Sequence, residues 1–244
     1  MNLAISEVLD RVRALNRQQL LALDADDRAQ IDSFLSYHRY SGEEKKCAER
    51  VASFDAGPLY WLTQFTQTEN PQAEDQGLEF RAPFPRKSYF VPLFAEFLIR
   101  QNRVLFIPKS RTMMTSWAAI GFATWAAQFN REETIVQTMN EDKCVHLIDY
   151  VRQLWENQDE WLRVRHPLVR KSSFSIQWEG GGEVAAIPSG ADKIRSFHPT
   201  TYILDEAAHI PEGEECLGAV RPSGARIICI STAAPGWFAE QCTL

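Results

Sequence analysis

The sequence lacks the cysteine patterns that would mark a metal-binding or disulfide-rich protein. Its five cysteines are odd in number and scattered, and no two of them form a Cys-x-x-Cys pair. A structural zinc site needs clustered cysteine or histidine ligands at short spacings, and a disulfide framework needs paired cysteines. We therefore expect reduced thiols, as in cytoplasmic proteins, and no zinc.

Positive charge and long apolar runs are also scarce. The 244 residues carry a formal net charge of −6 and a pI of about 5.5, so no overall basic field indicates a stand-alone nucleic-acid-binding module. The first residues contain neither a basic segment nor an apolar core, so we expect no signal peptide. No apolar run reaches the length of a membrane-spanning helix, and we expect no membrane partner.

The spacing of apolar residues along the chain changes near residue 103. Before it, residues 3 to 51 carry apolar positions at helical spacing. Residues 57 to 66 predict an aromatic helix opened by proline, which suits either a core or a stacking surface. Residues 80 to 88 are too rich in proline for a regular element, and an apolar helix follows from about residue 91 to 100.

Beyond residue 103, apolar strands alternate with helices. Strands are predicted at residues 104–107, 134–137, 202–205 and 226–230, helices at 117–129 and 142–155, and a glycine-linked hairpin at 174–178 and 184–187. This alternation predicts an α/β fold with a mainly parallel central sheet flanked by helices. We assign residues 1–80 to a helical N-terminal lid subdomain and residues 81–244 to the core domain.

Two adjacent carboxylates end one of the predicted strands. Asp205 and Glu206 follow an apolar run, and the small residues Ala207 and Ala208 leave space beside them. At a strand end, an aspartate can hold Mg²⁺ and a glutamate can polarise the water that attacks a γ-phosphate. The alternative is a strand that ends in a turn with two solvated acids.

The segment after the first core strand is the candidate phosphate loop. Only Ser116 matches the pattern Gly-x-x-x-x-Gly-Lys-Ser/Thr, and glycine is absent. Backbone N–H groups at the helix start can still face phosphate, with Lys109 or Arg111 as the cation and Ser116 at Mg²⁺. The alternative is a strand–helix turn with two solvated basic residues. The loop consists of Lys109, Ser110, Arg111, Thr112, Met113, Met114, Thr115 and Ser116.

Together these motifs resemble the ATPase domain of the large terminase subunit of tailed bacteriophages. In that family the basic residue of a deviant phosphate loop often stands at its beginning, as Lys109 does here, and an aliphatic run precedes Asp-Glu-Ala-Ala, as at residues 203–208. Residues 58–62 and 84–85 resemble the family's N-terminal region, and residues 230–236 resemble its coupling motif. The likeness covers most of residues 57–240 and implies a P-loop NTPase of the ASCE type.

The resemblance implies which residues bind ATP and Mg²⁺. Lys109, with Arg111 as helper or substitute, would neutralise the charge of the β- and γ-phosphates of ATP. Ser116, in the Walker A loop, and Asp205, in the Walker B strand, would hold Mg²⁺. The whole loop from Lys109 to Ser116 would surround the phosphates.

The resemblance also implies the residues that act on bound ATP. Glu206 would be the catalytic base, and Thr232 would sense the γ-phosphate and couple hydrolysis to movement; the alternative for Thr232 is an ordinary strand-end threonine. Arg195 resembles an arginine finger that completes the site of a neighbouring subunit. The alternative for Arg195 is a surface ion pair.

By this resemblance, the chain is the ATP-hydrolysing motor domain of a viral terminase large subunit, which drives double-stranded DNA into a procapsid. The implied partners are double-stranded DNA, the portal protein, the small terminase subunit and further copies of the chain in a ring on the portal. The isolated domain is expected to be a monomer. The implied location is the host cytoplasm, transiently at the procapsid portal, and the family's C-terminal nuclease domain is absent from this chain.

Two departures from the family pattern matter for the nucleotide. Loss of glycine limits positive φ and close backbone approach in the loop, so we expect weak nucleotide affinity. No adenine-reading glutamine is evident, which leaves Tyr89 or Phe90 as the candidate that stacks on the base.

Two other functions stay open. A helicase-like DNA translocase needs a second lobe for which 244 residues leave no space, and a non-catalytic assembly module would keep the fold with a degenerate loop.

Overall fold

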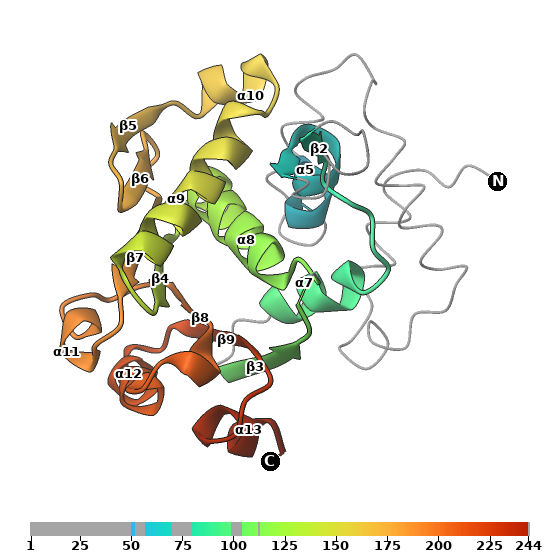
Figure 1. The fold of residues 1–244 in the computed structure, drawn as a ribbon. Coiled ribbons are helices and arrows are strands. Elements are labelled where there is room, and N and C mark those ends of the chain that lie inside the picture. Colours follow the sequence, from blue (N-terminus) through green and yellow to red (C-terminus); the bar gives the residue numbers. More distant parts are fainter. Residues whose placement is uncertain (1–49, 52–56, 70–79, 99–103, 112, 244) are drawn as a thin grey trace. The chain divides into compact units, whose positions relative to one another are not determined.

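The computed structural model describes residues 50–51, 57–69, 80–98, 104–111 and 113–243, which form two compact units (Figure 1). Unit 1 contains the described residues up to Leu98 together with Gln153–Val164, and unit 2 contains the rest. Apart from Arg50 and Val51, the helices predicted within residues 3 to 51 lie outside the described residues. The predicted domain boundary at residue 80 stays a prediction.

The aromatic helix α5 (Gly57–Phe65) supplies much of the core of unit 1. A proline in the first turn is tolerated because a helix makes no use of the N–H group at that position. Tyr60, Trp61 and Leu62 are fully buried, and the indole Nε1–H of Trp61 donates to Oε1 of Gln158 at 3.0 Å. The aromatic residues of this segment therefore form core rather than a stacking surface.

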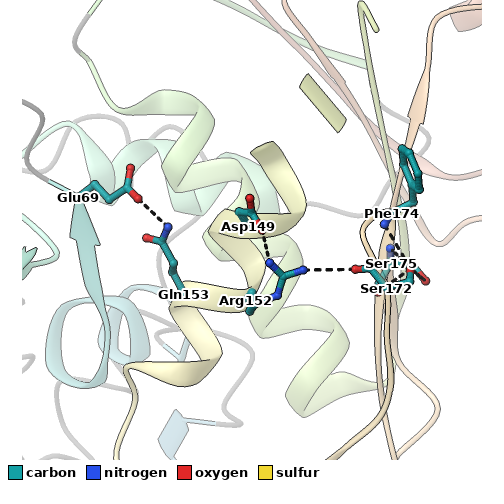
Figure 2. A network of polar contacts seen from close by, with 7 residues as sticks. All are labelled: Glu69, Asp149, Arg152, Gln153, Ser172, Phe174 and Ser175. Atoms are coloured by element: carbon teal, nitrogen blue, oxygen red, sulfur yellow. Dashed lines mark hydrogen bonds and ion pairs between the residues drawn. The ribbon is translucent and has the colours of Figure 1, made fainter. Parts of the chain in front are cut away.

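A short antiparallel pair, β1 (Gln67–Glu69) and β2 (Arg81–Pro83), also belongs to unit 1. The prediction that the proline-rich segment holds no regular element is therefore wrong for β2. A proline is compatible with an edge strand, and among the described residues β1 and β2 pair only with each other. The carboxylate of Glu69 accepts a hydrogen bond of 2.6 Å from Nε2 of Gln153, also in unit 1 (Figure 2).

Helix α7 (Phe90–Leu98) buries a row of phenylalanines in unit 1. Phe90 is fully buried and its ring contacts those of Phe84 and Phe94. It is therefore inaccessible to a nucleotide base, whereas Tyr89 is only partly buried. The remaining described helical segments of the unit are the end of α9 (Glu141–Glu156) and most of α10 (Glu160–Arg165).

A seven-stranded sheet organises unit 2, with the strand order β3-β9-β8-β4-β7-β6-β5. The pairs from β3 to β7 are parallel, and β6 and β5 extend the sheet in antiparallel fashion. The predicted α/β class with a mainly parallel sheet is confirmed. The strands are β3 (Val104–Lys109), β4 (Glu133–Thr138), β5 (Leu168–Lys171), β6 (Ser175–Trp178), β7 (Glu183–Pro188), β8 (Thr201–Asp205) and β9 (Arg226–Thr232).

Helices cover both faces of this sheet (Figure 1). Helix α8 (Thr115–Asn130) is apolar on all sides, as expected for a buried helix, and it packs on β4, β6, β7 and β8. On the other face, Tyr202 and Leu204 share a core cluster with Leu217 and Phe238. That cluster draws on α11 (Ala191–Ile194), α12 (Gly213–Val220) and α13 (Trp237–Thr243), and short 3₁₀ turns stand at Ala207–His209 (η2) and Arg221–Ser223 (η3).

Strand β5, at one edge of the seven-stranded sheet, was not predicted. Most of it is exposed, and a tight turn joins it to β6. The hydroxyl oxygen of Ser172 accepts the N–H groups of Phe174 and Ser175 at 3.2 and 2.9 Å, and Arg152, which also pairs with Asp149, donates to the Ser172 carbonyl (Figure 2). Because β5 has no alternation of apolar and polar residues, its sequence gives no strand signal.

The predicted hairpin of β6 and β7 is confirmed, and one of its glycines is required by space. A Cβ atom on Gly182 would lie 1.9 Å from the carbonyl oxygen of Ala127 in α8. We expect Gly182→Ala to destabilise unit 2 by about 1–3 kcal/mol, because rigid backbone has to move. Thermal denaturation tests this against Gly218→Ala in α12, where the added Cβ meets nothing within 4 Å. Equal melting temperatures for the two variants would contradict the close packing.

A buried ion pair joins the amino-terminal ends of three strands. Nη1 of Arg226 lies 3.4 Å from Oε2 of Glu132, and both side chains are only 4% exposed. The hydroxyl of Thr201 lies within 3.2 Å of both groups, and the Arg226 guanidinium lies over the ring of Phe122. This network therefore fastens β4, β8 and β9 to α8 at the edge of the sheet away from their carboxyl ends.

Among the described residues, no helix combines the length and apolarity that a membrane crossing requires.

Candidate active site

The candidate site lies at the carboxyl ends of β3, β9 and β8, which are neighbours in the sheet. In an open α/β sheet this edge is where ligands bind. Lys109 ends β3 and is paired in register with Thr232 at the end of β9, while Asp205 ends β8. Segments that are far apart in the sequence thus meet at one edge.

Ser116 and Asp205 are in direct contact. The hydroxyl of Ser116, in the first turn of α8, donates to Oδ1 of Asp205 at 2.8 Å, and Asp205 is only 7% exposed. A hydroxyl and a carboxylate side by side are the oxygen ligands that Mg²⁺ prefers, and Mg²⁺ usually takes only one or two from the protein when phosphates supply others. The predicted metal pair therefore fits this ion. Within the described part of the chain, no cluster of three or more acidic, histidine or cysteine side chains offers a separate metal site.

Burial raises the pKa of Asp205 to about 6, although the hydrogen bond from Ser116 acts in the opposite direction. The neighbouring charge of Glu206 raises this pKa further and that of Lys109 lowers it. A carboxylate with a raised pKa accepts protons readily and is held in its charged form only at a cost. A cation beside it would relieve that cost, as expected of a metal ligand.

The raised pKa predicts a pH-dependent penalty on stability. Between the unfolded pKa near 4 and the folded pKa of about 6, the folded state binds a proton that the unfolded state has released, so stability falls as pH rises through this range. We expect Asp205→Asn to raise the melting temperature at pH 8. The corresponding gain in the free energy of unfolding is up to about 3 kcal/mol, and it shrinks towards pH 4. The exposed Asp192→Asn is the control, and a gain that does not vary with pH would contradict the assignment.

Lys109 and Glu206 form an ion pair at the same edge. Nζ of Lys109 lies 3.6 Å from Oε1 of Glu206, and the two side chains are 11% and 29% exposed. The structure therefore brings Lys109 to the acidic residues, while Arg111 is exposed in the loop that follows. One cation adjacent to both a helix start and a carboxylate is suitably placed to approach a phosphate.

Two residues of the site adopt left-handed backbone conformations without being glycine. Met114 has φ 53° and Glu206 has φ 56°. Such a conformation costs roughly 1–2 kcal/mol for a residue with a side chain, and strain of this kind collects at functional sites. The third such residue, Arg131, follows the last turn of α8, where left-handed backbone is common.

Loss of glycine was expected to limit positive φ in this loop, but Met114 adopts it. This residue stands at the position of the second glycine in the phosphate-loop pattern and takes the conformation that a glycine would take freely. Among the described residues, the N-cap Met114 makes no side-chain hydrogen bond to the start of α8, which suits an anion site. Ser110 is exposed, Met113 and Ser116 are half-buried, Thr115 is buried, and Thr112 lies outside the described residues.

Thr232 contacts a residue that sequence analysis did not single out, His209. Nε2 of His209 lies 2.9 Å from Oγ1 of Thr232 and 4.0 Å from Oε2 of Glu206. The backbone N–H of Ala208 donates to the hydroxyl of Ser231 at 3.1 Å. His209 stands four residues after Asp205, but only the pairing of β8 with β9 brings it to Thr232.

Arg195 lies outside this cluster. It follows α11, its side chain is 66% exposed, and Nη1 lies 2.5 Å from Oδ1 of Asp192. Within the described chain the surface ion pair is therefore its observed contact. A role in the site of a neighbouring subunit stays a prediction.

Comparison with solved structures identifies the fold. The crystal structure of the HK97 bacteriophage large terminase matches 77% of this chain with a TM-score of 0.52. The chain has the fold of part of a large terminase. The match has 12% sequence identity and covers 38% of the HK97 protein. The large terminase ATPase domain of Thermus phage P74-26 is a weaker match, with a TM-score of 0.45, 16% identity and coverage of 71% of this chain and 73% of that domain.

The resemblance to large terminases is thus confirmed at the level of fold. No protein-family model matches the sequence, and a search of curated proteins finds no match. The terminase fold does not by itself assign a reaction to the site, because one fold can host many functions.

Proposed function

We propose that this chain is an ATPase and the motor domain of a viral terminase large subunit, which drives double-stranded DNA into a procapsid. The observation that carries the proposal is the 2.8 Å hydrogen bond between Ser116 and Asp205. It joins the start of the helix after β3 to the end of β8, which is where a P-loop NTPase gathers its metal ligands.

Each residue of the cluster has a distinct task in this proposal. The ammonium of Lys109 and the N–H groups at the start of α8 bind and orient the phosphates of ATP. Ser116 and Asp205 hold Mg²⁺, which when bound adds positive charge beside those phosphates. Glu206 orients and polarises the attacking water as a general base. Thr232 lies beside Lys109 in register and senses the γ-phosphate.

The partners of the motor follow from the same proposal. Double-stranded DNA is the substrate that moves, and the portal protein and small terminase subunit are the protein partners. Further copies of the chain form a ring in which Arg195 of one copy completes the site of the next. Under this proposal the protein works in the host cytoplasm and, during packaging, at the portal.

The first test is ATP binding and steady-state hydrolysis with Mg²⁺ by the full chain and two loop variants. We expect Lys109→Ala to weaken ATP binding by about 10- to 100-fold, which is the loss of one or two charge-assisted hydrogen bonds. Lys143→Ala, which removes an exposed lysine from α9, is the matched control. A larger loss with Arg111→Ala than with Lys109→Ala would assign the phosphate cation to Arg111 instead.

The other two functions give different results in the same experiments. A non-catalytic assembly module would neither bind nor hydrolyse ATP at any protein concentration. A helicase-like translocase would hydrolyse ATP but unwind strands, whereas the packaging motor moves intact duplex in the presence of a portal. An ATPase rate per chain that rises with protein concentration would support a ring in which Arg195 acts between subunits.

A further inference from the structure

His209 faces both Glu206 and Thr232 with the same nitrogen atom. Its Nε2 lies 2.9 Å from Oγ1 of Thr232 and 4.0 Å from Oε2 of Glu206. Its side chain is 41% exposed at the edge of the sheet, so His209 is not a core histidine held by surrounding apolar side chains. Nε2 is within hydrogen-bond distance of Thr232, and its contact with Glu206 is electrostatic, an ion pair when the ring is protonated.

The turn that carries His209 is fastened to β9 at two consecutive positions. The backbone N–H of Ala208 donates to the hydroxyl of Ser231 at 3.1 Å, and His209 contacts the next residue, Thr232. Within the turn, the N–H of His209 donates to the carbonyl oxygen of Glu206 at 2.8 Å. A displacement at the end of β9 is therefore passed directly to the backbone and the side chain of Glu206.

The two carboxylate oxygens of Glu206 face different basic side chains. Oε1 faces the ammonium of Lys109 at 3.6 Å, and Oε2 faces His209 at 4.0 Å. The proposed function assigns Lys109 to phosphate, and a phosphate would compete with Glu206 for that ammonium. When Lys109 turns to a phosphate, the contact with His209 remains to orient the carboxylate.

We propose that His209 is a positioning residue that couples the orientation of Glu206 to the position of Thr232. The inference rests on the proposed function, since Glu206 acts there as the base and Thr232 as the sensor. His209 itself does not touch the reacting atoms. It holds Glu206 towards the attacking water only while Thr232 is in place, which links hydrolysis to the state of β9.

Steady-state ATP hydrolysis and ATP binding by His209→Ala and His209→Gln test the proposal in the full chain. We expect His209→Ala to lower kcat by about 10- to 100-fold, the usual effect of a misplaced catalytic group, while KM and the Kd for ATP stay within about twofold. Glutamine keeps an N–H donor, so His209→Gln should recover at least about a third of the lost rate. The exposed His198→Ala is the matched control and should retain the rate of the original chain.

An unchanged kcat in His209→Ala would overturn the proposal. So would a melting temperature and a Kd that fall along with kcat, because that pattern indicates a structural role. The absence of rescue by glutamine would also count against it.

A second readout does not need activity. The ¹⁵N resonance of His209 Nε2, identified by its absence from the His209→Gln spectrum, should shift in Thr232→Val but stay near its original value in Thr232→Ser. Glu206→Gln should shift it as well. If the chemical shift of His209 Nε2 is the same in Thr232→Val and in Glu206→Gln as in the original chain, the coupling is overturned. A chain that binds no ATP but shows both shifts would overturn the proposed function and leave the structural coupling intact.

Discussion

Glu206→Gln is expected to lower steady-state ATP hydrolysis by about 10²- to 10⁴-fold, the usual contribution of a general base. Glutamine has nearly the same shape as glutamate but carries no negative charge and cannot accept the proton of the attacking water. ATP binding should be retained or strengthened, because Lys109 loses the carboxylate that lies 3.6 Å from its ammonium. Single-turnover hydrolysis and equilibrium binding of ATP measure the two effects separately.

The comparison needs a control that changes charge without touching the site. Glu214→Gln removes an exposed carboxylate from α12 and should leave both rate and affinity unchanged. A Glu206→Gln variant that turns over at the original rate would assign the base to another residue. If neither the original chain nor Glu206→Gln binds or hydrolyses ATP, the assembly-module function would be favoured.

Glu132→Ala is expected to destabilise unit 2 by about 3–5 kcal/mol, since it removes the carboxylate that lies 3.4 Å from the buried guanidinium of Arg226. Both side chains are only 4% exposed, and Thr201 binds both of them, so water cannot easily replace the lost partner. Native-state hydrogen exchange at the backbone amides of β8 and β9 reports the local free energy of opening in this unit.

Two further variants distinguish a buried pair from an exposed one. Asp192→Ala removes the partner of the exposed Arg195, and its effect should stay below about 1 kcal/mol. The double substitution of Glu132→Leu with Arg226→Met should recover much of the loss, because apolar side chains of similar volume need no partner. A cost below about 1 kcal/mol for Glu132→Ala alone would show that Arg226 is satisfied by other groups.

The sheet could be predicted because its central strands β8 and β9 are buried on both faces and therefore appear as continuous apolar runs. Residues 202–204 and 227–230 are such runs, and the structure has strands at both. Strand β5 and the short helices α11, α12 and α13 were missed because exposed or short elements carry little periodic signal. The insertion of β9 between β3 and β8 depends on tertiary packing, which no local pattern encodes.

The candidate site was predictable where its residues stand at strand ends. Lys109, Asp205 and Thr232 are found at one edge because carboxyl ends of parallel strands meet there. His209 was missed, since its partner Thr232 is 23 residues away and only the register of the sheet joins them. The φ of Met114 was also unpredictable, because a methionine gives no indication that its backbone is left-handed.

The left-handed backbone of Met114 affects how much order a ligand has to impose on the loop when it binds. Helix α8 is buried along almost its whole length, so its first turn is fixed by the fold, and Met114 is held in place from that side. The conformational cost of this turn is therefore met during folding, and a phosphate that arrives at the helix start need not order it. Association with a preorganised turn loses less entropy than association with a glycine-rich loop that has many conformations to give up.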